Sequence, residues 1–195
     1  MKDVRCSFVV SLCFLLVLLV CLAEMFFPHT STWGIREALA SSFDALEESQ
    51  VKEIVYTYGL KGKEWILVRK QDFTLTLYRG GSAIASYPVA IGKNDGDKQK
   101  SGDMRTPEGV FSVVSVENSS YWVHDFGDGR GPISGAYGPY FIRLKTPYRG
   151  IGIHGTHDPN SIGTKATEGC IRLKNEDLLV LVKEVKKGMI VVILP

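Results

Sequence analysis

The stretch 151-IGIHGTHDPNSIGTKATEGCIRL-173 contains the densest grouping of reactive side chains in the sequence. Its first residues are typical of a strand that ends at His154, and a loop rich in glycine and hydroxyl residues then leads to Gly169 and Cys170. The pattern predicts an imidazole at the end of a strand and a thiol at the end of the loop that follows. The rest of the chain is therefore interpreted as the scaffold of this pair.

A thiol beside an imidazole forms a nucleophile with its base. A cysteine with its ordinary pKa of about 8.5 is only a few per cent thiolate at neutral pH, so a nucleophilic Cys170 needs a base, and His154 is the candidate. A backbone carbonyl can fix the tautomer of the imidazole, and Gly169 leaves N–H groups free to hold an oxyanion. Two alternatives stay open here: purely structural roles for both residues, and a zinc site of His154, His157 and Cys170.

The sequence on both sides of this stretch is mostly strand-like. Phe73, Leu75 and Leu77 alternate with other residues at the period of two that a strand requires. One helix is predicted in the last third of the chain, capped by Asn175 and stopped by Gly188. Strands are predicted at 64–70, 73–79, 82–91, 110–116, 140–145, 151–154 and 189–194.

Two long connections, 92–108 and 117–138, interrupt the predicted strands. The second carries several aromatic side chains among its glycines, and His124 within it is predicted to be structural or solvent-facing. Long loops with aromatic residues inside a compact domain are more often lids or binding loops than disordered segments. We therefore expect both connections to cover a binding site.

The N-terminus reads as an export segment. Lys2 and Arg5 precede an apolar run over residues 8–23. The length of this run lies between a secretory core of about 7–15 residues and a membrane span of about 20 residues, so a cleaved signal peptide and a retained anchor are both open. The charged residues before the run predict that the remainder of the chain lies outside the cytoplasm.

The predicted organisation has three parts. Residues 1–40 form the export signal or signal-anchor with a connector, residues 41–62 form a short helical lead-in that Ser42 caps, and residues 63–195 form one mostly β domain. Cys170 is the only cysteine beyond the export segment, so the exported part has no internal disulfide.

Composition narrows the possible partners. The 195 residues carry 23 Lys plus Arg against 21 Asp plus Glu, a formal net charge of +2. Nucleic-acid binders usually gather a basic stripe against phosphates, whereas the basic residues here are interleaved with acids. Nucleic acid is therefore not an expected partner.

Several motifs occur in order along residues 63–195. They are ILVRKQDFTLTLYRGG at 66–81, YPVAIGK at 87–93, GDMRTPEG at 102–109, HGT at 154–156, and Thr167 with GCIRL at 169–173. Together they resemble the L,D-transpeptidase catalytic domain family, the cysteine enzymes that cross-link and remodel bacterial peptidoglycan. The resemblance covers about residues 63–195 and implies a mainly β fold, a β-sandwich of mixed sheets with one helix in its C-terminal region and long lid loops.

The resemblance also implies roles for single residues. Cys170 would be the nucleophile and His154 its proton acceptor and donor, with the backbone carbonyl of Gly155 orienting the imidazole. Backbone N–H groups around Gly169 and Cys170 would stabilise the oxyanion.

Three further residues are predicted to bind substrate: Thr167, Glu168 and Arg172. Arg172 would hold a substrate carboxylate, and a structural salt bridge under the loop is its alternative. The family usually has a histidine where this chain has Glu168, whose carboxylate would either disfavour the thiolate or contact substrate amines. Arg105, with the Thr-Pro pair that follows it, is expected to shape the cleft.

The implied reaction needs no metal, ATP or other cofactor. Cys170 would attack the diaminopimelate-type carbonyl of a tetrapeptide stem, release D-alanine, and pass the acyl group from the thioester to an amine of a second stem peptide or an envelope protein. Water as acceptor would make the chain an L,D-carboxypeptidase, and a catalytically silent peptidoglycan-binding protein is the other alternative. The expected location is the periplasm or the outer face of the inner membrane, with membrane contact only through the N-terminal segment.

Overall fold

The structure, a computed structural model, describes residues 32–127, 129 and 131–195. The chain divides into two compact units, Met1–Glu53 and Ile54–Pro195. The predicted export segment and the first part of the connector lie outside the described residues. Within the described part, no helix combines the length and apolar character needed to cross a bilayer.

Helix α2 (Thr32–Thr57) begins earlier than the sequence predicts. Ser42 does not cap it but lies inside it, where the Ser42 hydroxyl donates a hydrogen bond to the carbonyl of Ala38 at 2.6 Å. A serine that bonds to the carbonyl one turn back satisfies its hydroxyl without ending the helix. The predicted start at Ser42 is therefore wrong.

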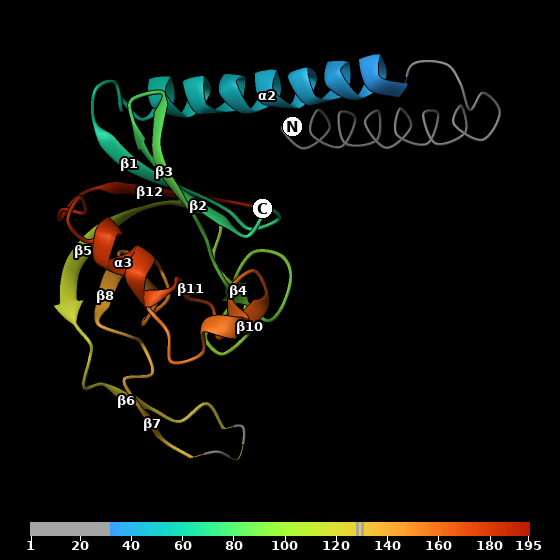
Figure 1. Ribbon diagram of the computed structural model, residues 1–195. Helices are drawn as coiled ribbons and strands as arrows, with labels where there is room; N and C mark the ends of the chain where they lie inside the picture. Colours follow the sequence, from blue (N-terminus) through green and yellow to red (C-terminus); the bar gives the residue numbers. More distant parts are fainter. Residues whose placement is uncertain (1–31, 128, 130) are drawn as a thin grey trace. The chain divides into compact units, whose positions relative to one another are not determined.

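The unit Ile54–Pro195 is built on one curled, mixed sheet of eight strands (Figure 1), which confirms the mainly β prediction. β1 runs parallel to β12, β9 runs parallel to β11, and the other neighbours in the sheet are antiparallel. The strands, in their order across the sheet, are β11 (Ile171–Arg172), β9 (Gly152–His154), β8 (Tyr140–Leu144), β5 (Gly109–Asn118), β12 (Ile190–Leu194), β1 (Glu64–Arg69), β2 (Thr74–Arg79) and β3 (Ser82–Pro88).

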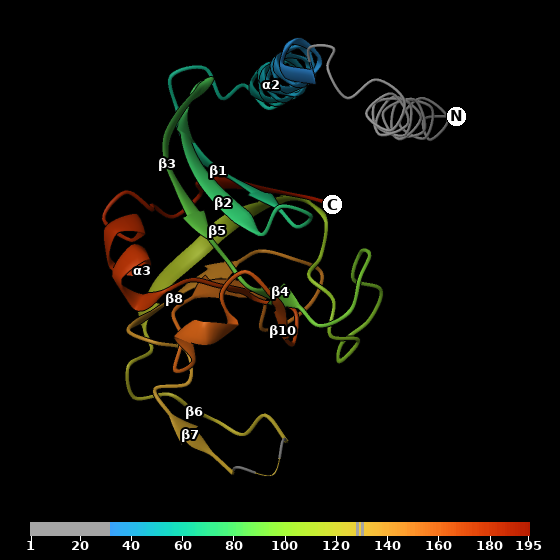
Figure 2. The ribbon, with the colours of Figure 1, turned by 45° about the vertical axis from the view of Figure 1, so that its right-hand side comes forward.

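Strand β5 joins the two halves of the sheet. Its first residues pair with β12 and its later residues pair with β8, with a register shift between Val113 and Ser115. A bulge of this kind bends a strand and increases its twist. Figure 2 shows the result: β1, β2 and β3 lie on one side of β5, and β8 lies on the other.

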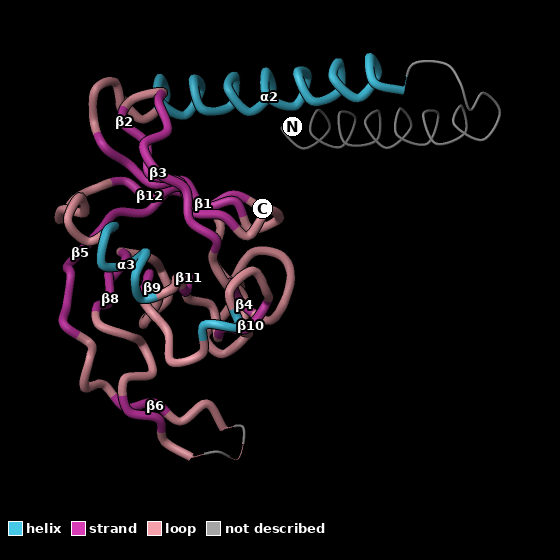
Figure 3. Tube along the Cα trace, in the orientation of Figure 1, coloured by secondary structure: helices cyan, strands magenta, loops and turns pink. Residues whose placement is uncertain are grey.

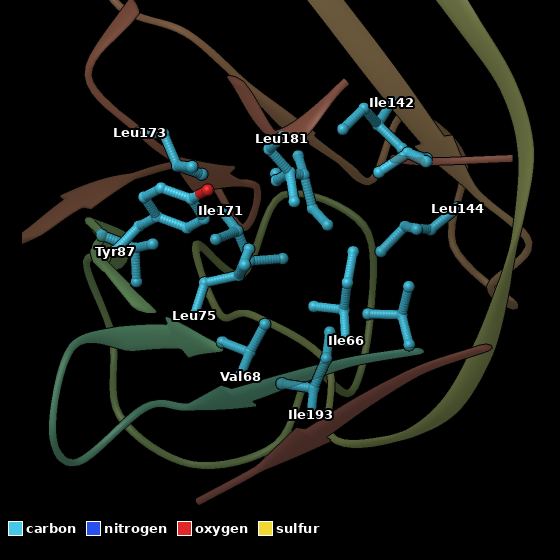
Figure 4. Packing of buried hydrophobic residues seen from close by; sticks show 14 of the residues in the cluster. Ile66, Val68, Leu75, Tyr87, Ile142, Leu144, Ile171, Leu173, Leu181 and Ile193 are labelled. Atoms are coloured by element: carbon cyan, nitrogen blue, oxygen red, sulfur yellow. The ribbon is translucent and has the colours of Figure 1, made fainter. Parts of the chain in front are cut away.

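The hydrophobic core fills the space between these two halves (Figure 4). Ile66, Val68 and Ile193 project from one half toward Ile142 and Leu144 on the other, and all five are at most 4% exposed. Burial of such side chains contributes roughly 1.5–3 kcal/mol each. The core therefore supports β9, which carries His154, and β11, which follows Cys170 directly.

Helix α3 (Asn175–Leu181) is shorter than predicted and is capped differently. Lys174 occupies the N-cap position, and the Asn175 side chain instead bonds to the backbone of Thr156, accepting from its N–H at 2.8 Å and donating to its carbonyl at 3.0 Å. After Leu181 the chain continues in turns, and the N–H of Gly188 donates to Val113 of β5. Both predicted ends of this helix are therefore corrected.

Two short ladders complete the fold. β4 (Ile91–Gly92) pairs with β10 (Lys165–Thr167), and β6 (Val123–His124) pairs with β7 (Ile133–Ser134). The two predicted long connections are mostly irregular, and the β6–β7 hairpin projects from the rest of its unit (Figure 3).

Candidate active site

The register of β9 and β11 brings the predicted reactive residues together. Arg172 lies opposite His154, and Ile171 lies opposite Ile153. Neighbouring residues on paired strands point to the same face, and residues two apart along a strand do so as well. Cys170, Arg172 and His154 therefore share one face, while both isoleucines, each 0% exposed, face the core.

That face opens into a cleft of about 300 Å³. His154 and Cys170 both line it, and both long loops contribute walls, as predicted: Lys98 and Met104 come from the first, and Tyr137 from the second. The full lining is Lys98, Ser101, Gly102, Met104, Phe126, Tyr137, Arg149, Gly150, Ile151, His154, Thr167, Glu168, Cys170 and Arg172.

The imidazole of His154 is fixed in one orientation. Its Nδ1 lies 2.6 Å from the carbonyl oxygen of Gly155, as predicted, and because a carbonyl only accepts, Nδ1 carries the proton. The ring contacts Phe141, which stacks on it at a centroid distance of 5.6 Å, and Tyr137, which meets it edge-on at 4.9 Å. Phe141 and Tyr137 also meet each other at 5.7 Å, so the three rings form one cluster. Burial lowers the pKa of His154 to about 3, so the ring is neutral near pH 7 and its Nε2 lone pair is free to act as a base.

The Cys170 thiol is also neutral near pH 7. Its Sγ lies 3.2 Å from the carbonyl oxygen of Gly150, an arrangement in which a thiol proton is donated. Burial raises the pKa of Cys170 to about 11; a backbone hydrogen bond from Gly152 and the Arg172 charge oppose the rise, and the Glu168 carboxylate adds to it. The resting pair is therefore a thiol and an imidazole, not a thiolate and an imidazolium.

Gly169 and Thr167 shape the backbone at the nucleophile. The Gly169 N–H donates to the Thr167 hydroxyl at 3.1 Å, and that hydroxyl donates to the Cys170 carbonyl at 2.6 Å. The Gly169 N–H is thus engaged in this structure, and its predicted role at the oxyanion stays a prediction. The Cys170 N–H is the other donor named in that prediction. Thr167 is 2% exposed, and these two bonds make it a residue that positions the loop.

A side chain at position 169 would not fit. The backbone of Gly169 has a φ of +130°, and an added Cβ would lie 2.6 Å from the carbonyl oxygen of Arg105. The first long loop therefore packs directly against the segment before Cys170. Arg105 shapes the site through this backbone contact, in line with its predicted role.

A buried ion pair stiffens the first loop. Lys98 donates to Asp103 at 2.7 Å, and Asp103 also accepts from three backbone N–H groups. Burial alone would raise the pKa of Asp103, but these donors outweigh it and hold the pKa below its usual range. Lys98 also donates to the Arg105 carbonyl at 3.3 Å, so the ion pair supports the wall next to Gly169.

Arg172 has spare hydrogen-bonding capacity at the cleft. It is 4% exposed, and its Nη1 donates to the hydroxyl of Ser161 at 2.9 Å, while its buried Nε has no partner among the described residues. Its guanidinium also lies 5.9 Å from the Phe126 ring. The alternative of a structural salt bridge is not observed within the described part of the chain.

Glu168 lies at the cleft beside the second loop. Its Oε2 lies 3.2 Å from Nε2 of His124, and its side chain is 38% exposed. His124 also meets Phe126 edge-on at 4.5 Å. His124, predicted to be structural or solvent-facing, thus contacts a residue of the cleft.

The alternative zinc site is not assembled. His157 directs its Nδ1 to the carbonyl of Ala136 at 3.1 Å, and His154 directs its Nδ1 to Gly155. Across the described ranges, no three His, Cys, Asp or Glu side chains come together in a way that could hold a metal ion.

Phe141, Lys98 and Asn175 contribute to the site without having been predicted. Phe141 reads as an ordinary strand residue, Lys98 as one of many loop lysines, and Asn175 as a helix cap. Only the aromatic content of the second loop gave a signal, through Tyr137 and Phe126. Phe141, Lys98 and Asn175 act through contacts between segments that lie far apart in the sequence.

Comparison with known proteins identifies the family of the chain. Residues 63–193 match the L,D-transpeptidase catalytic domain family, also called YkuD. The chain is 30% identical over 166 residues to the putative L,D-transpeptidase YkuD of Bacillus licheniformis, covering 82% of this chain and 87% of that protein. It is 32% identical over 136 residues to the putative L,D-transpeptidase YqjB of Bacillus subtilis, covering 69% of this chain and 73% of that protein.

Solved structures share the fold. An L,D-transpeptidase from Xylanimonas cellulosilytica superposes with a TM-score of 0.52 at 16% identity, covering 69% of this chain and 61% of that one. The catalytic domain of the E. faecium L,D-transpeptidase superposes with a TM-score of 0.51 at 21% identity, covering 68% of this chain and 98% of that one. From its matched sequence and its fold, the chain belongs to the L,D-transpeptidase catalytic domain family.

Proposed function

We propose that the chain is a peptidoglycan L,D-transpeptidase with Cys170 as nucleophile. The observation that carries the proposal is the shared face of Cys170, His154 and Arg172 at the cleft, with the Nε2 of His154 unprotonated. The donor is a tetrapeptide stem of peptidoglycan, the acceptor is an amine, and no cofactor takes part.

The first half-reaction forms a thioester. The Cys170 proton moves to Nε2 of His154 as the sulfur attacks the carbonyl carbon of the diaminopimelate-type residue. The Cys170 N–H holds the oxyanion of the tetrahedral intermediate. Collapse breaks the C–N bond, and the imidazolium gives its proton to the departing D-alanine amine.

The second half-reaction is the reverse with a new amine. The acceptor nitrogen attacks the thioester carbonyl, His154 takes the proton from that nitrogen, and the C–S bond breaks. The proton returns to the Cys170 sulfur, so the site is regenerated. The energy of the cleaved peptide bond is conserved in the thioester, which is why transfer needs no ATP.

Arg172 binds a carboxylate of the donor stem. Its buried Nε lacks a partner, and a buried guanidinium with an unsatisfied donor is a strong site for a carboxylate. Glu168 contacts the amine substrate and not the donor stem, and Thr167 acts indirectly through the backbone of Cys170.

Defined tetrapeptide muropeptides test the activity. We expect mass spectrometry to show release of D-alanine and a new amide to an added amine, both absent with Cys170→Ser. Release of D-alanine with water as the sole acceptor would identify an L,D-carboxypeptidase. Stable binding of the stem without any product would identify a silent binding protein.

We also propose that the segment before the catalytic unit exports the chain, so that residues 54–195 meet peptidoglycan in the cell envelope. The support is the apolar run at 8–23 behind Lys2 and Arg5. A fusion at Pro195 to a reporter that is active only outside the cytoplasm should be active. Activity of a cytoplasm-only reporter at the same position would contradict this placement.

A further inference from the structure

The lining of the cleft carries both basic and acidic side chains, which suit substrate groups of opposite charge. Arg149 and Arg172 line it with Lys98, whose charge is balanced by Asp103. Glu168 is the only acidic side chain of the lining, as far as the described residues go. The cleft thus offers guanidinium groups to a carboxylate and a single carboxylate to a cation.

The Glu168 carboxylate is available to a ligand. Among the described residues, the only possible ion-pair partner within 4.0 Å of the Glu168 carboxylate is Nε2 of His124, which is charged only when the histidine is protonated. No Lys or Arg pairs with it in the parts of the chain that the structure describes. The side chain is 38% exposed, so a cation that enters the cleft can reach it.

Glu168 also shares the cleft with the reacting sulfur. It lies two positions before Cys170, lines the same cleft, and its charge contributes to the raised pKa of the thiol. A carboxylate at this place works against the thiolate. A role in the second half-reaction, when the sulfur is held in a thioester, avoids that conflict.

We infer that Glu168 is the residue that binds the acceptor amine, which it holds as an ammonium ion. This inference rests on the proposed function and assigns a binding residue to its acceptor. The carboxylate holds the ammonium beside the thioester until its nitrogen loses a proton and attacks. Water gains nothing from this contact, so Glu168 favours transfer over hydrolysis.

Partitioning of the acyl-enzyme between two nucleophiles tests the inference. The acyl-enzyme is formed on the full chain with a tetrapeptide donor, then divided between a second stem peptide, whose amine is cationic, and hydroxylamine, which is uncharged at neutral pH. Glu168→Gln keeps the shape and the contact to His124 but removes the charge. Glu168→Asp keeps the charge, and Glu176→Gln removes one carboxylate from the exposed start of α3 as a matched control.

We expect Glu168→Gln to lower the second-order rate constant for the stem peptide by about 10- to 100-fold, the range expected for a lost charged hydrogen bond. Formation of the acyl-enzyme and its reaction with hydroxylamine should not slow down. Glu168→Asp should recover part of the loss, and Glu176→Gln should behave like the unaltered chain.

Two results would overturn the inference while leaving the proposed function intact. An equal loss with both nucleophiles would show that Glu168 acts on the structure of the site, and no loss with either would show that it does not bind the acceptor. Failure of the unaltered chain to form an acyl-enzyme would instead refute the proposed function, and the inference would fall with it.

Discussion

The charge state of the resting Cys170–His154 pair gives a quantitative prediction. With a thiol pKa of about 11, roughly one Cys170 in ten thousand is thiolate at pH 7. A cysteine with the ordinary pKa of about 8.5 is about 3% thiolate at that pH, so Cys170 in the folded chain should be alkylated about 300-fold more slowly.

The assay is the rate of iodoacetamide labelling as a function of pH. Because the sequence has four cysteines, labelling is followed on the Cys170 peptide by mass spectrometry. We expect the logarithm of the rate to rise with a slope of about one from pH 7 to about pH 10, without a plateau. In urea the same peptide should titrate near pH 8.5.

The variant His154→Ala tests whether Cys170 and His154 rest as a neutral pair or as an ion pair. His154 is uncharged near neutral pH because burial lowers its pKa to about 3, so its removal should change labelling of Cys170 little while turnover falls by about 10²–10⁴-fold. A labelling plateau below pH 8 that His154→Ala abolishes would refute the reasoning, since it would reveal a preformed thiolate–imidazolium pair.

Four other perturbations have definite expected outcomes. Cys170→Ser should abolish transfer to an amine while circular dichroism stays unchanged, and near-normal transfer in a folded sample would contradict the nucleophile assignment. Gly169→Ala should destabilise the chain by about 1–3 kcal/mol in urea unfolding, since its φ of +130° is strained for alanine; an unchanged midpoint would count against the close packing of this segment. Asp103→Asn should lower the urea midpoint because it leaves the buried Lys98 charge uncompensated. The control Glu48→Gln alters an exposed ion pair on a helix and should lower the midpoint far less, so equal effects of the two variants would contradict the prediction. Because the pKa of Asp103 is lowered in the fold, its stabilising contribution should be complete above about pH 4 and be lost as the pH falls further, which acid titration of the urea midpoint measures.

The sequence predicted most of the strands and the reactive residues. Alternation at a period of two marked β2, and the strand end followed by a glycine-rich loop marked His154 and Cys170. These are local signals, because the face on which a strand residue lies and the chemistry of a side chain are set by the residue and its near neighbours. The orienting carbonyl of Gly155 is equally local, since it follows the histidine directly.

The predicted helix caps were wrong where the side chain bonds to another backbone group, either within the same helix or in a distant segment. Ser42 bonds to Ala38 inside a longer helix, and Asn175 bonds to Thr156 across the fold. Both residue types are good caps, but their side chains bond to whichever backbone group the fold presents.

Only the tertiary structure determines the protonation states of His154 and Cys170. Burial against Phe141 and Tyr137 keeps His154 neutral, and burial together with the Glu168 charge keeps Cys170 a thiol. A sequence names the groups that can ionise, but their pKa values depend on how much water the folded chain removes and which charges it brings near. For the same reason, the contact of Glu168 with His124 could not be read from residues that lie 44 positions apart.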